Sequence, residues 1–133
     1  MNNWLERTEL LLGEEKLARL RSANVLVVGV GGVGAYAAEM IVRAGVGRMT
    51  IADADKVSET NINRQLVALH STVGREKCEV LAERLRDINP DLELKMVNRF
   101  IKDSEINTSA FSFYHRQGFV RIIIKNIICI ANT

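Results

Sequence analysis

Residues 25–34 read VLVVGVGGVG, and this stretch decides the fold. An unbroken β-branched run of this kind is typical of a strand buried on both faces of a parallel sheet. The run leads into a GxGxxG pattern formed by Gly29, Gly31 and Gly34. Glycines between a strand and a helix allow a tight turn and bring backbone N–H groups close to phosphate oxygens. We therefore expect a phosphate-binding loop at this junction.

The residues after the loop complete a βαβ unit. An alanine-rich helix is expected over residues 32–44 and a second strand over residues 48–53. The whole unit has the usual length of about 30 residues for this motif. Asp53 ends the second strand and follows Gly34 by about 20 residues, the spacing at which an acid binds the ribose hydroxyls of a dinucleotide. Taken alone, the loop and Asp53 favour NAD.

The remaining periodic segments predict an α/β fold, the N-terminal part of a Rossmann-like, doubly wound and mainly parallel sheet. A leading amphipathic helix is expected over residues 6–21, a helix over 74–88 and a third strand over 92–97. We expect residues 1–103 to form one nucleotide-binding domain and residues 104–133 to form an atypical tail. A chain of 133 residues has room for one such core.

The tail differs in composition from the rest of the chain. It has no acidic residue beyond Glu105, and it holds three of the four phenylalanines and a series of isoleucines. The β-propensity predicts a strand over residues 120–130. Two interpretations stay open: an ordinary hydrophobic strand, or sequence that does not belong to the native domain.

Bulk composition excludes few classes of protein. The net charge of +2 neither requires nor excludes a nucleic-acid partner. Cys78 and Cys129 have no CxxC spacing, and His70 and His115 have no metal-ligand spacing, so we expect a reduced cytoplasmic protein without a metal site of its own. The N-terminus is polar and charged, and no apolar run approaches the roughly 20 residues that cross a membrane.

A polar segment behind the βαβ unit argues against NAD. Asp53 and Asp55 are followed by TNINRQ at residues 60–65 and then by Lys77. A guanidinium makes forked contacts with phosphate oxygens, and an ammonium is a compact charge for the β- and γ-phosphates. Such charges offset the negative charge that develops when pyrophosphate departs. Arg64 or Lys77 alone is best explained as a solvated surface charge, but together they favour a nucleoside triphosphate.

These motifs resemble the ubiquitin-activating-type adenylating superfamily, whose bacterial members include the ThiF and MoeB adenylyltransferases. The resemblance rests on GVGGVG, DAD, TNINRQ and the VGREK run that ends at Lys77. ERTELLLG near the N-terminus and the AERLRDINP stretch are more similar to the tRNA threonylcarbamoyladenosine dehydratase branch. The resemblance extends from about Arg7 to Phe100, roughly three quarters of the chain.

The resemblance implies an ATP site with Mg²⁺. It implies that Asp53 holds the ribose and that Arg64 and Lys77 act on the triphosphate. An N-terminal arginine of this family reaches the ATP of the partner subunit, and Arg7 is the matching residue, which implies a homodimer. The other residues implied at the nucleotide are Gly29, Gly31, Gly32, Gly34, Asp55, Asn61 and Gln65.

The implied function is ATP-dependent activation of a carboxylate, with cyclising dehydration of threonylcarbamoyladenosine in tRNA as the first expectation. The alternatives are an adenylyltransferase for the C-terminus of a ubiquitin-like sulfur carrier, with a sulfur-transfer partner, an NAD-binding domain, and a truncated, inactive family member. The last alternative has sequence support. The family places a further aspartate after the next strand, in a D-x-x-D-like stretch that helps bind magnesium, and nothing beyond Asp103 matches it.

Overall fold

The computed structural model describes residues 4–102, 119–124 and 127–132. Three parallel strands form its centre: β1 (Asn24–Val28), β2 (Arg48–Ala52) and β3 (Glu93–Val97). β2 lies between the other two and pairs with each along its full length. The carboxyl ends of all three strands therefore meet at one edge of the sheet, where ligands bind in open α/β folds.

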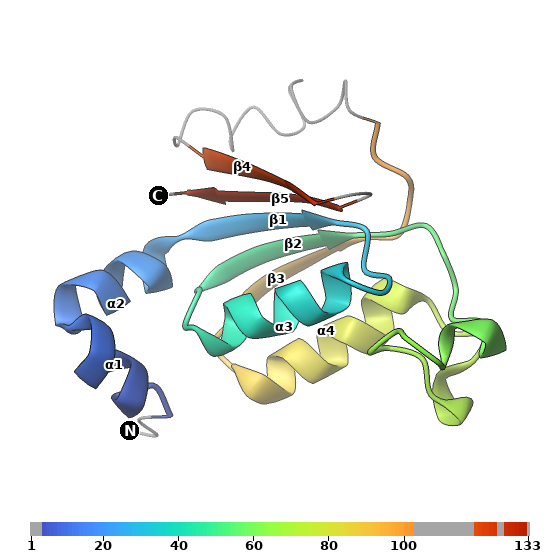
Figure 1. The fold of residues 1–133 in the computed structure, drawn as a ribbon, viewed down its shortest axis with the longest axis horizontal. Helices are drawn as coiled ribbons and strands as arrows, with labels where there is room; N and C mark the ends of the chain where they lie inside the picture. Colours follow the sequence, from blue (N-terminus) through green and yellow to red (C-terminus); the bar gives the residue numbers. More distant parts are fainter. Residues whose placement is uncertain (1–3, 103–118, 125–126, 133) are drawn as a thin grey trace.

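Two helices connect these strands and cover one face of the sheet (Figure 1). They are α3 (Gly34–Arg43) and α4 (Lys77–Ile88). Alternate strand residues share a core with the buried positions of both helices, as the period of two in a strand requires. The fully buried members of this core include Val25, Val27, Met49, Ile51, Val42, Leu81 and Leu85. The expected α/β, Rossmann-like fold is confirmed.

The N-terminal segment differs from the single helix expected over residues 6–21. It forms two helices, α1 (Glu6–Leu12) and α2 (Glu14–Ser22), separated by Gly13. The expectation is wrong because Gly13 has φ +83° and ψ +160°, a conformation that only glycine adopts readily. The break lets Leu5 and Leu17 both pack against Gly45, at the end of α3.

The start of α4 also differs, and this difference matters for the site. The sequence predicts a helix from residue 74, but Gly74 has φ +88° and the helix begins at Lys77. An antiparallel bridge between Lys56 and Glu76 holds the preceding residues in an extended conformation. Lys77 is thus the first residue of the helix rather than a residue in its second turn. Two short 3-10 helices, η1 (Glu59–Asn61) and η2 (His70–Thr72), lie between β2 and α4.

Two further strands extend the sheet beyond β1. β4 (Phe119–Ile124) and β5 (Ile127–Asn132) are antiparallel to each other, and β5 pairs antiparallel with β1. The strand order is β3-β2-β1-β5-β4. The sequence predicted one strand over residues 120–130, and the polar pair Lys125-Asn126 separates the two strands that are found. Residues 103–118, with Glu105 and His115, lie outside the described part of the chain. Among the described residues, no helix has the length and apolar character needed to span a bilayer.

Candidate functional site

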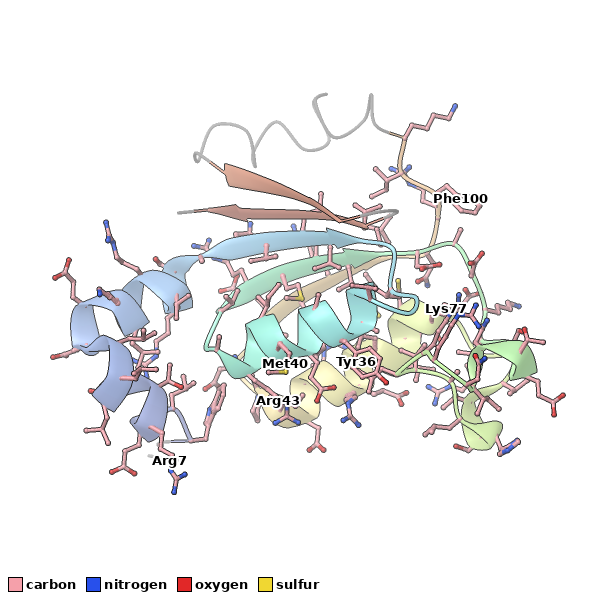
Figure 2. The ribbon with its side chains drawn as sticks, viewed as in Figure 1. Arg7, Tyr36, Met40, Arg43, Lys77 and Phe100 are labelled. Carbon is pink, nitrogen blue, oxygen red and sulfur yellow. The ribbon has the colours of Figure 1, made fainter. Side chains whose placement is uncertain are left out.

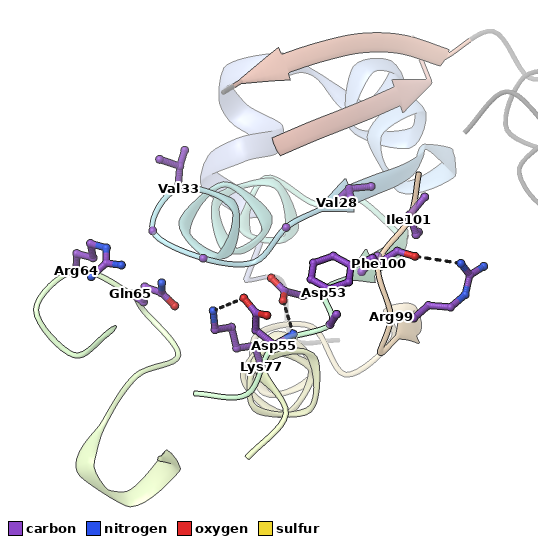
Figure 3. A pocket seen from close by; sticks show the side chains of 15 residues that line it. Val28, Val33, Asp53, Asp55, Arg64, Gln65, Lys77, Arg99, Phe100 and Ile101 are labelled. Atoms are coloured by element: carbon purple, nitrogen blue, oxygen red, sulfur yellow. Dashed lines mark hydrogen bonds and ion pairs between the residues drawn. The ribbon is translucent and has the colours of Figure 1, made fainter. Parts of the chain in front are cut away.

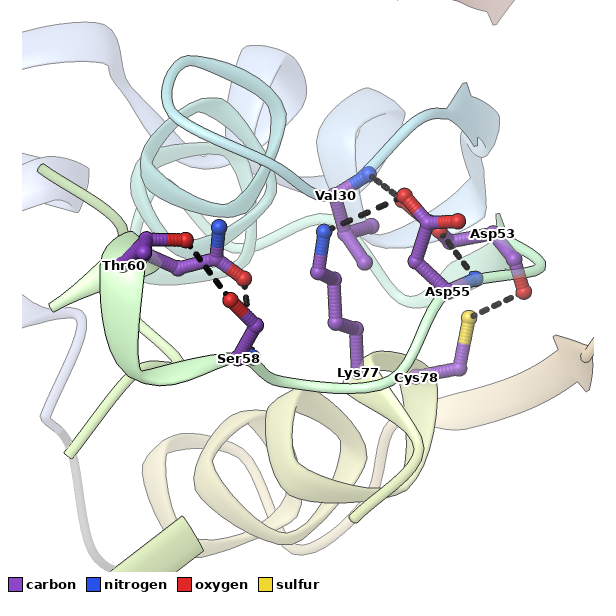
Figure 4. Close-up of polar contacts among 8 residues, drawn as sticks. Val30, Asp53, Asp55, Ser58, Thr60, Lys77 and Cys78 are labelled. Atoms are coloured by element: carbon purple, nitrogen blue, oxygen red, sulfur yellow. Dashed lines mark hydrogen bonds and ion pairs between the residues drawn. The ribbon is translucent and has the colours of Figure 1, made fainter. Parts of the chain in front are cut away.

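The glycine loop is fastened to the end of β2 by a network centred on Asp53 (Figure 4). Val30 N donates to Asp53 Oδ2 at 2.8 Å, and Asp55 N donates to Asp53 Oδ1 at 2.8 Å. Gly29, with φ +86°, donates its N–H to Ala52 O at 2.7 Å. Both carboxylate oxygens of Asp53 thus hold backbone in place, so this residue first of all shapes the loop.

A cavity of about 650 Å³ opens at the carboxyl ends of the three parallel strands (Figure 3). It brings together the glycine loop, the end of β2, the TNINRQ segment and the first residue of α4. Segments far apart in sequence meet here because parallel strands deliver their following loops to the same edge. The expected site residues that line it are Gly29, Gly31, Gly32, Asp53, Asp55, Arg64, Gln65 and Lys77.

The glycines keep the floor of this cavity free of side chains. A Cβ atom built on Gly31 would lie 3.5 Å from Gln65 Nε2, and one on Gly32 would lie 3.9 Å from Arg64 Cγ. A side chain at either position would therefore project into the gap between the loop and the 60–65 segment. Their absence leaves a shallow cradle, of the kind that accepts phosphate groups beside a helix N-terminus.

Gln65 contributes a buried polar group that faces this cradle. The residue is 8% exposed, and its Oε1 has no hydrogen-bond partner in the described structure. A buried acceptor without a partner is destabilising, so a ligand atom is the natural occupant of the space. Its Nε2 is the atom nearest the Cβ position of Gly31, so the amide presents a donor to an anionic ligand in the cradle.

Two cations enter the cavity from different elements. Lys77 is 5% exposed, and its Nζ lies 3.3 Å from Asp55 Oδ2, on a side chain that is 58% exposed. Arg64 is exposed and donates through Nη1 to Thr60 O at 3.1 Å and to Asn63 Oδ1 at 3.0 Å. Both of these acceptors are neutral, so they orient the guanidinium without cancelling its charge.

Three expected site residues lie apart from the cavity lining. Asn61 Oδ1 accepts a hydrogen bond from Ser58 N at 3.0 Å and caps the 3-10 helix η1, which shapes the segment that carries Arg64. Gly34 is buried as the first residue of α3. Arg7 is exposed on α1, at the opposite end of the molecule from Lys77 (Figure 2).

The cavity also includes residues that the sequence analysis missed. Arg99, Phe100 and Ile101 follow β3 and line the side of the cavity away from Arg64. They match no short motif, but their position was predictable in outline. The third strand of a parallel sheet must end beside the first two, so the residues after it had to lie near the loop.

Cys78 sits under the site as a packing residue. It is fully buried, and its Sγ lies 3.8 Å from Asp53 O and 3.9 Å from Val97 O. Burial, with a smaller contribution from the Asp53 carboxylate, raises the pKa of this thiol to about 12. Cys78 is therefore a buried structural thiol in this fold. Within the described residues, no three His, Cys, Asp or Glu side chains cluster as a metal site would need.

Comparison with known proteins gives a consistent result. The sequence model of the ThiF family matches residues 5–124. A tRNA threonylcarbamoyladenosine dehydratase of Bacillus subtilis is 47% identical over 100 residues, which cover 75% of this chain and 39% of the relative. A molybdopterin-synthase adenylyltransferase of Escherichia coli is 39% identical over 87 residues, 65% of this chain and 35% of the relative.

A solved structure of a tRNA threonylcarbamoyladenosine dehydratase also aligns with this fold. A crystal structure of the E. coli tRNA N6-threonylcarbamoyladenosine dehydratase in complex with ATP aligns with a TM-score of 0.74 at 42% identity. The alignment covers 80% of this chain and 45% of that one. The chain therefore spans less than half the length of these relatives.

Proposed function

The chain belongs to the ThiF family, and from this premise we propose that its cavity binds ATP and supports adenylation of a carboxylate. The family membership confirms the resemblance seen in the sequence. One observation carries the proposal: a side-chain-free glycine cradle faces Arg64, Gln65 and Lys77 across a single cavity. A dehydrogenase has no need of this set of groups, whereas a triphosphate does.

In this proposal, different residues of the cavity contact different parts of the nucleotide. The cradle at Gly31 and Gly32 and the N-terminus of α3 receive the phosphates, because free backbone N–H groups and the helix dipole favour anions. Arg64 and Lys77 approach the same phosphates from the opposite wall. Asp53 takes the ribose, since each of its oxygens keeps a lone pair beyond the one used by the loop.

The chemistry begins with a carboxylate oxygen of the substrate attacking the α-phosphorus of ATP. The bond between the α-phosphorus and the bridging oxygen breaks, and pyrophosphate leaves with its electron pair. An acyl adenylate is the other product. Arg64 and Lys77 lower the barrier because they stabilise the charge that grows on the departing pyrophosphate. Their positions are set before the reaction by the η1 turn and by the start of α4.

We take the substrate from the tRNA threonylcarbamoyladenosine dehydratase relatives, two of which are 47% and 42% identical to the chain over the matched residues. In this proposal the carboxylate is that of threonylcarbamoyladenosine in tRNA. A nucleophilic atom within the modification then attacks the activated carbonyl and loses its proton, AMP leaves, and a ring closes with net loss of water. The molybdopterin-synthase adenylyltransferase relative supports a second candidate, adenylation of the C-terminus of a sulfur-carrier protein.

Magnesium fits the cavity only together with the nucleotide. Mg²⁺ usually binds through one or two carboxylates and the substrate phosphates. Asp55 is the cavity carboxylate best placed to serve, because its side chain is more than half exposed and its contact with Lys77 is long. The further aspartate that the family resemblance places after the next strand has no match beyond Asp103 in this sequence.

We also propose a homodimer, on the position of Arg7. This arginine lies on the exposed surface of α1, far from the cavity of its own chain (Figure 2). A role at the triphosphate therefore needs a second copy that docks its α1 near the first copy's glycine loop. A hydrodynamic measurement of the oligomeric state tests this part separately, and a monomer that binds ATP normally would exclude it.

Calorimetric titration with ATP and magnesium tests the proposal directly. We expect binding by the 133-residue chain and a loss of about 10- to 100-fold in affinity for Arg64→Ala, the usual value of hydrogen bonds to a charged group. Arg19→Ala, on the exposed surface of α2, is the matched control and should bind like the parent. A chain that is folded but shows no affinity for ATP would contradict the proposed function.

Product analysis then separates the two candidate substrates. Cyclisation of the tRNA modification with release of AMP and pyrophosphate supports the first. An acyl adenylate on a carrier with a C-terminal glycine, without turnover of modified tRNA, supports the second. NAD binding that ATP does not displace would argue against both.

A further inference from the structure

The cavity has two ends of different chemistry (Figure 3). Arg64, Gln65 and Lys77 make one end polar and cationic. Asp53 lies between this end and the other, which is mainly apolar. The apolar lining consists of Val28, Ala52, Ala54, Phe100 and Ile101, and Arg99 lines the same end. A ligand that fills the whole cavity must therefore be anionic at one end and apolar at the other.

Phe100 is the unusual member of the apolar end. Its side chain lines the cavity, yet the residue is 77% exposed. In Figure 3 its ring lies beside Asp53, on the side away from Arg64 and Gln65. Covering a solvent-exposed aromatic ring with a flat apolar group lowers the free energy of the complex. The ring is thus a ready surface for a planar partner.

The backbone fixes this ring relative to the nucleotide site. Asp53 N donates to Val97 O at 3.1 Å, so the end of β3 is tied to the end of β2. Arg99 Nη1 donates to Phe100 O at 3.2 Å and supports the carbonyl of the same residue. The segment that carries Phe100 therefore leaves the sheet at a defined distance from Asp53.

We propose that Phe100 is the stacking platform for the base of the bound nucleotide. This rests on the proposed function, because the phosphates at Gly31 and the ribose at Asp53 set the direction in which the base continues. That direction leads from the cationic end to the apolar end of the cavity. A purine placed there covers the ring of Phe100 and lies between it and the small residues Ala52 and Ala54.

Stacking of this kind discriminates by the area of the base and not by its hydrogen-bonding edge, since every base has a π-face. Phe100 is therefore expected to favour purine over pyrimidine triphosphates without separating ATP from GTP. It contributes nothing to the binding of the phosphates themselves. This last property makes the proposal testable with inorganic tripolyphosphate, which has phosphates but no base.

The experiment compares affinities for ATP, CTP and inorganic tripolyphosphate in the full chain. For Phe100→Ala we expect ATP affinity to fall about 5- to 140-fold, the range reported for removal of one stacked base contact, and CTP affinity to fall less. Tripolyphosphate should bind as before. Phe100→Tyr should retain ATP affinity, because it keeps the ring. Met96→Ala, an exposed apolar position on β3 outside the cavity lining, is the matched control and should change none of these values.

The outcomes separate this proposal from the one on which it rests. Failure of the unsubstituted chain to bind ATP overturns the proposed function and the platform with it. Equal ATP affinity for the unsubstituted chain and Phe100→Ala overturns the platform alone. An equal loss for ATP and tripolyphosphate also overturns it, because Phe100 would then support the shape of the site and not the base. A loss of affinity for the nucleotides, larger for ATP than for CTP, with unchanged affinity for tripolyphosphate supports it.

Discussion

Replacing Gly31 by alanine separates the folding of the glycine loop from its function. The φ angle of Gly31 lies outside the left-handed region, so alanine can adopt the same backbone conformation. The new methyl group would meet its nearest neighbour, Gln65 Nε2, at 3.5 Å, which is an ordinary van der Waals contact. The fold therefore has room for it. The cradle does not, because the methyl group points into the space assigned to the phosphates.

The expected magnitudes follow from this geometry. Gly31→Ala should leave the free energy of unfolding unchanged or raise it by up to about 1 kcal/mol, because alanine restricts the unfolded chain. Its binding free energy for ATP should weaken by about 1.5–3 kcal/mol, the value of one lost hydrogen bond to a charged phosphate. In Gly31→Ala we thus expect the ATP affinity to fall while the free energy of unfolding rises or stays the same.

Urea denaturation and calorimetric titration with ATP measure the two quantities on the same preparations. Gly13→Ala is the opposite control: Gly13 lies outside the cavity lining with φ +83°, so alanine should cost about 1–3 kcal/mol of stability and leave ATP affinity unchanged. If Gly31→Ala folds normally and binds ATP as tightly as the parent chain, the phosphates do not lie on this loop. The reasoning would then be refuted at its first step.

Three further predictions concern the fold that supports the site. Gly47→Ala should lower the free energy of unfolding by at least about 1–3 kcal/mol in urea, because its Cβ would lie 2.1 Å from the carbonyl oxygen of Arg21; unchanged stability would contradict the packing of α2 on β2. Cys78 should resist thiol reagents at pH 8 until the chain unfolds, since burial raises its pKa to about 12, and mass spectrometry of the labelled residue would reveal fast labelling of the native state. Arg84, and to a smaller extent Arg43, lowers the pKa of Glu39 below its ordinary value of 4.5. Glu39→Gln should therefore be less stable than the parent at pH 7 by about 1–2 kcal/mol, and the difference should shrink as the pH falls below 4.5, where the parent's carboxylate becomes protonated; a difference independent of pH would exclude the ion pair as its cause.

Local patterns predicted the centre of the fold and the glycine loop, whereas the family resemblance supplied many of the other candidate site residues. The strand before Gly29, the glycine loop and Asp53 follow from residue types that only this junction requires. Lys77 was identified as a candidate because it follows the TNINRQ segment that contains Arg64. Each of these signals is a residue type at a recognisable spacing along the chain, so it can be found without knowledge of tertiary contacts.

The features that the sequence did not predict depend on tertiary geometry. Gly13 falls within a regular pattern of leucines, and that pattern does not show that the positive φ of Gly13 ends the helix and lets Leu5 and Leu17 pack on Gly45. Phe100 lacks any motif, because its place in the cavity is set by the position of β3 in the sheet. Periodicity cannot reveal such contacts, since it describes one element at a time.

The charges of the cavity explain why nucleotide and metal should bind together. Two carboxylates, those of Asp53 and Asp55, line a cavity that we propose binds an anion. In the structure each carboxylate has partners that offset its negative charge. Asp53 is occupied by two backbone N–H groups, and Asp55 is balanced by Lys77. The ammonium–carboxylate separation of 3.3 Å is long for a charge-assisted hydrogen bond, so phosphate oxygens can compete for Lys77 at little cost.

That competition would leave Asp55 without its cation, close to several phosphate oxygens. Repulsion between the carboxylate and the phosphates would oppose binding unless a second cation arrived with the nucleotide. A magnesium ion coordinated by the phosphates meets this need, since its preferred ligands are carboxylate and phosphate oxygens. We therefore infer that Lys77 and Asp55 act as one unit: each balances the charge of the other in the structure, and on nucleotide binding the ammonium would turn to the phosphates and the carboxylate to the metal.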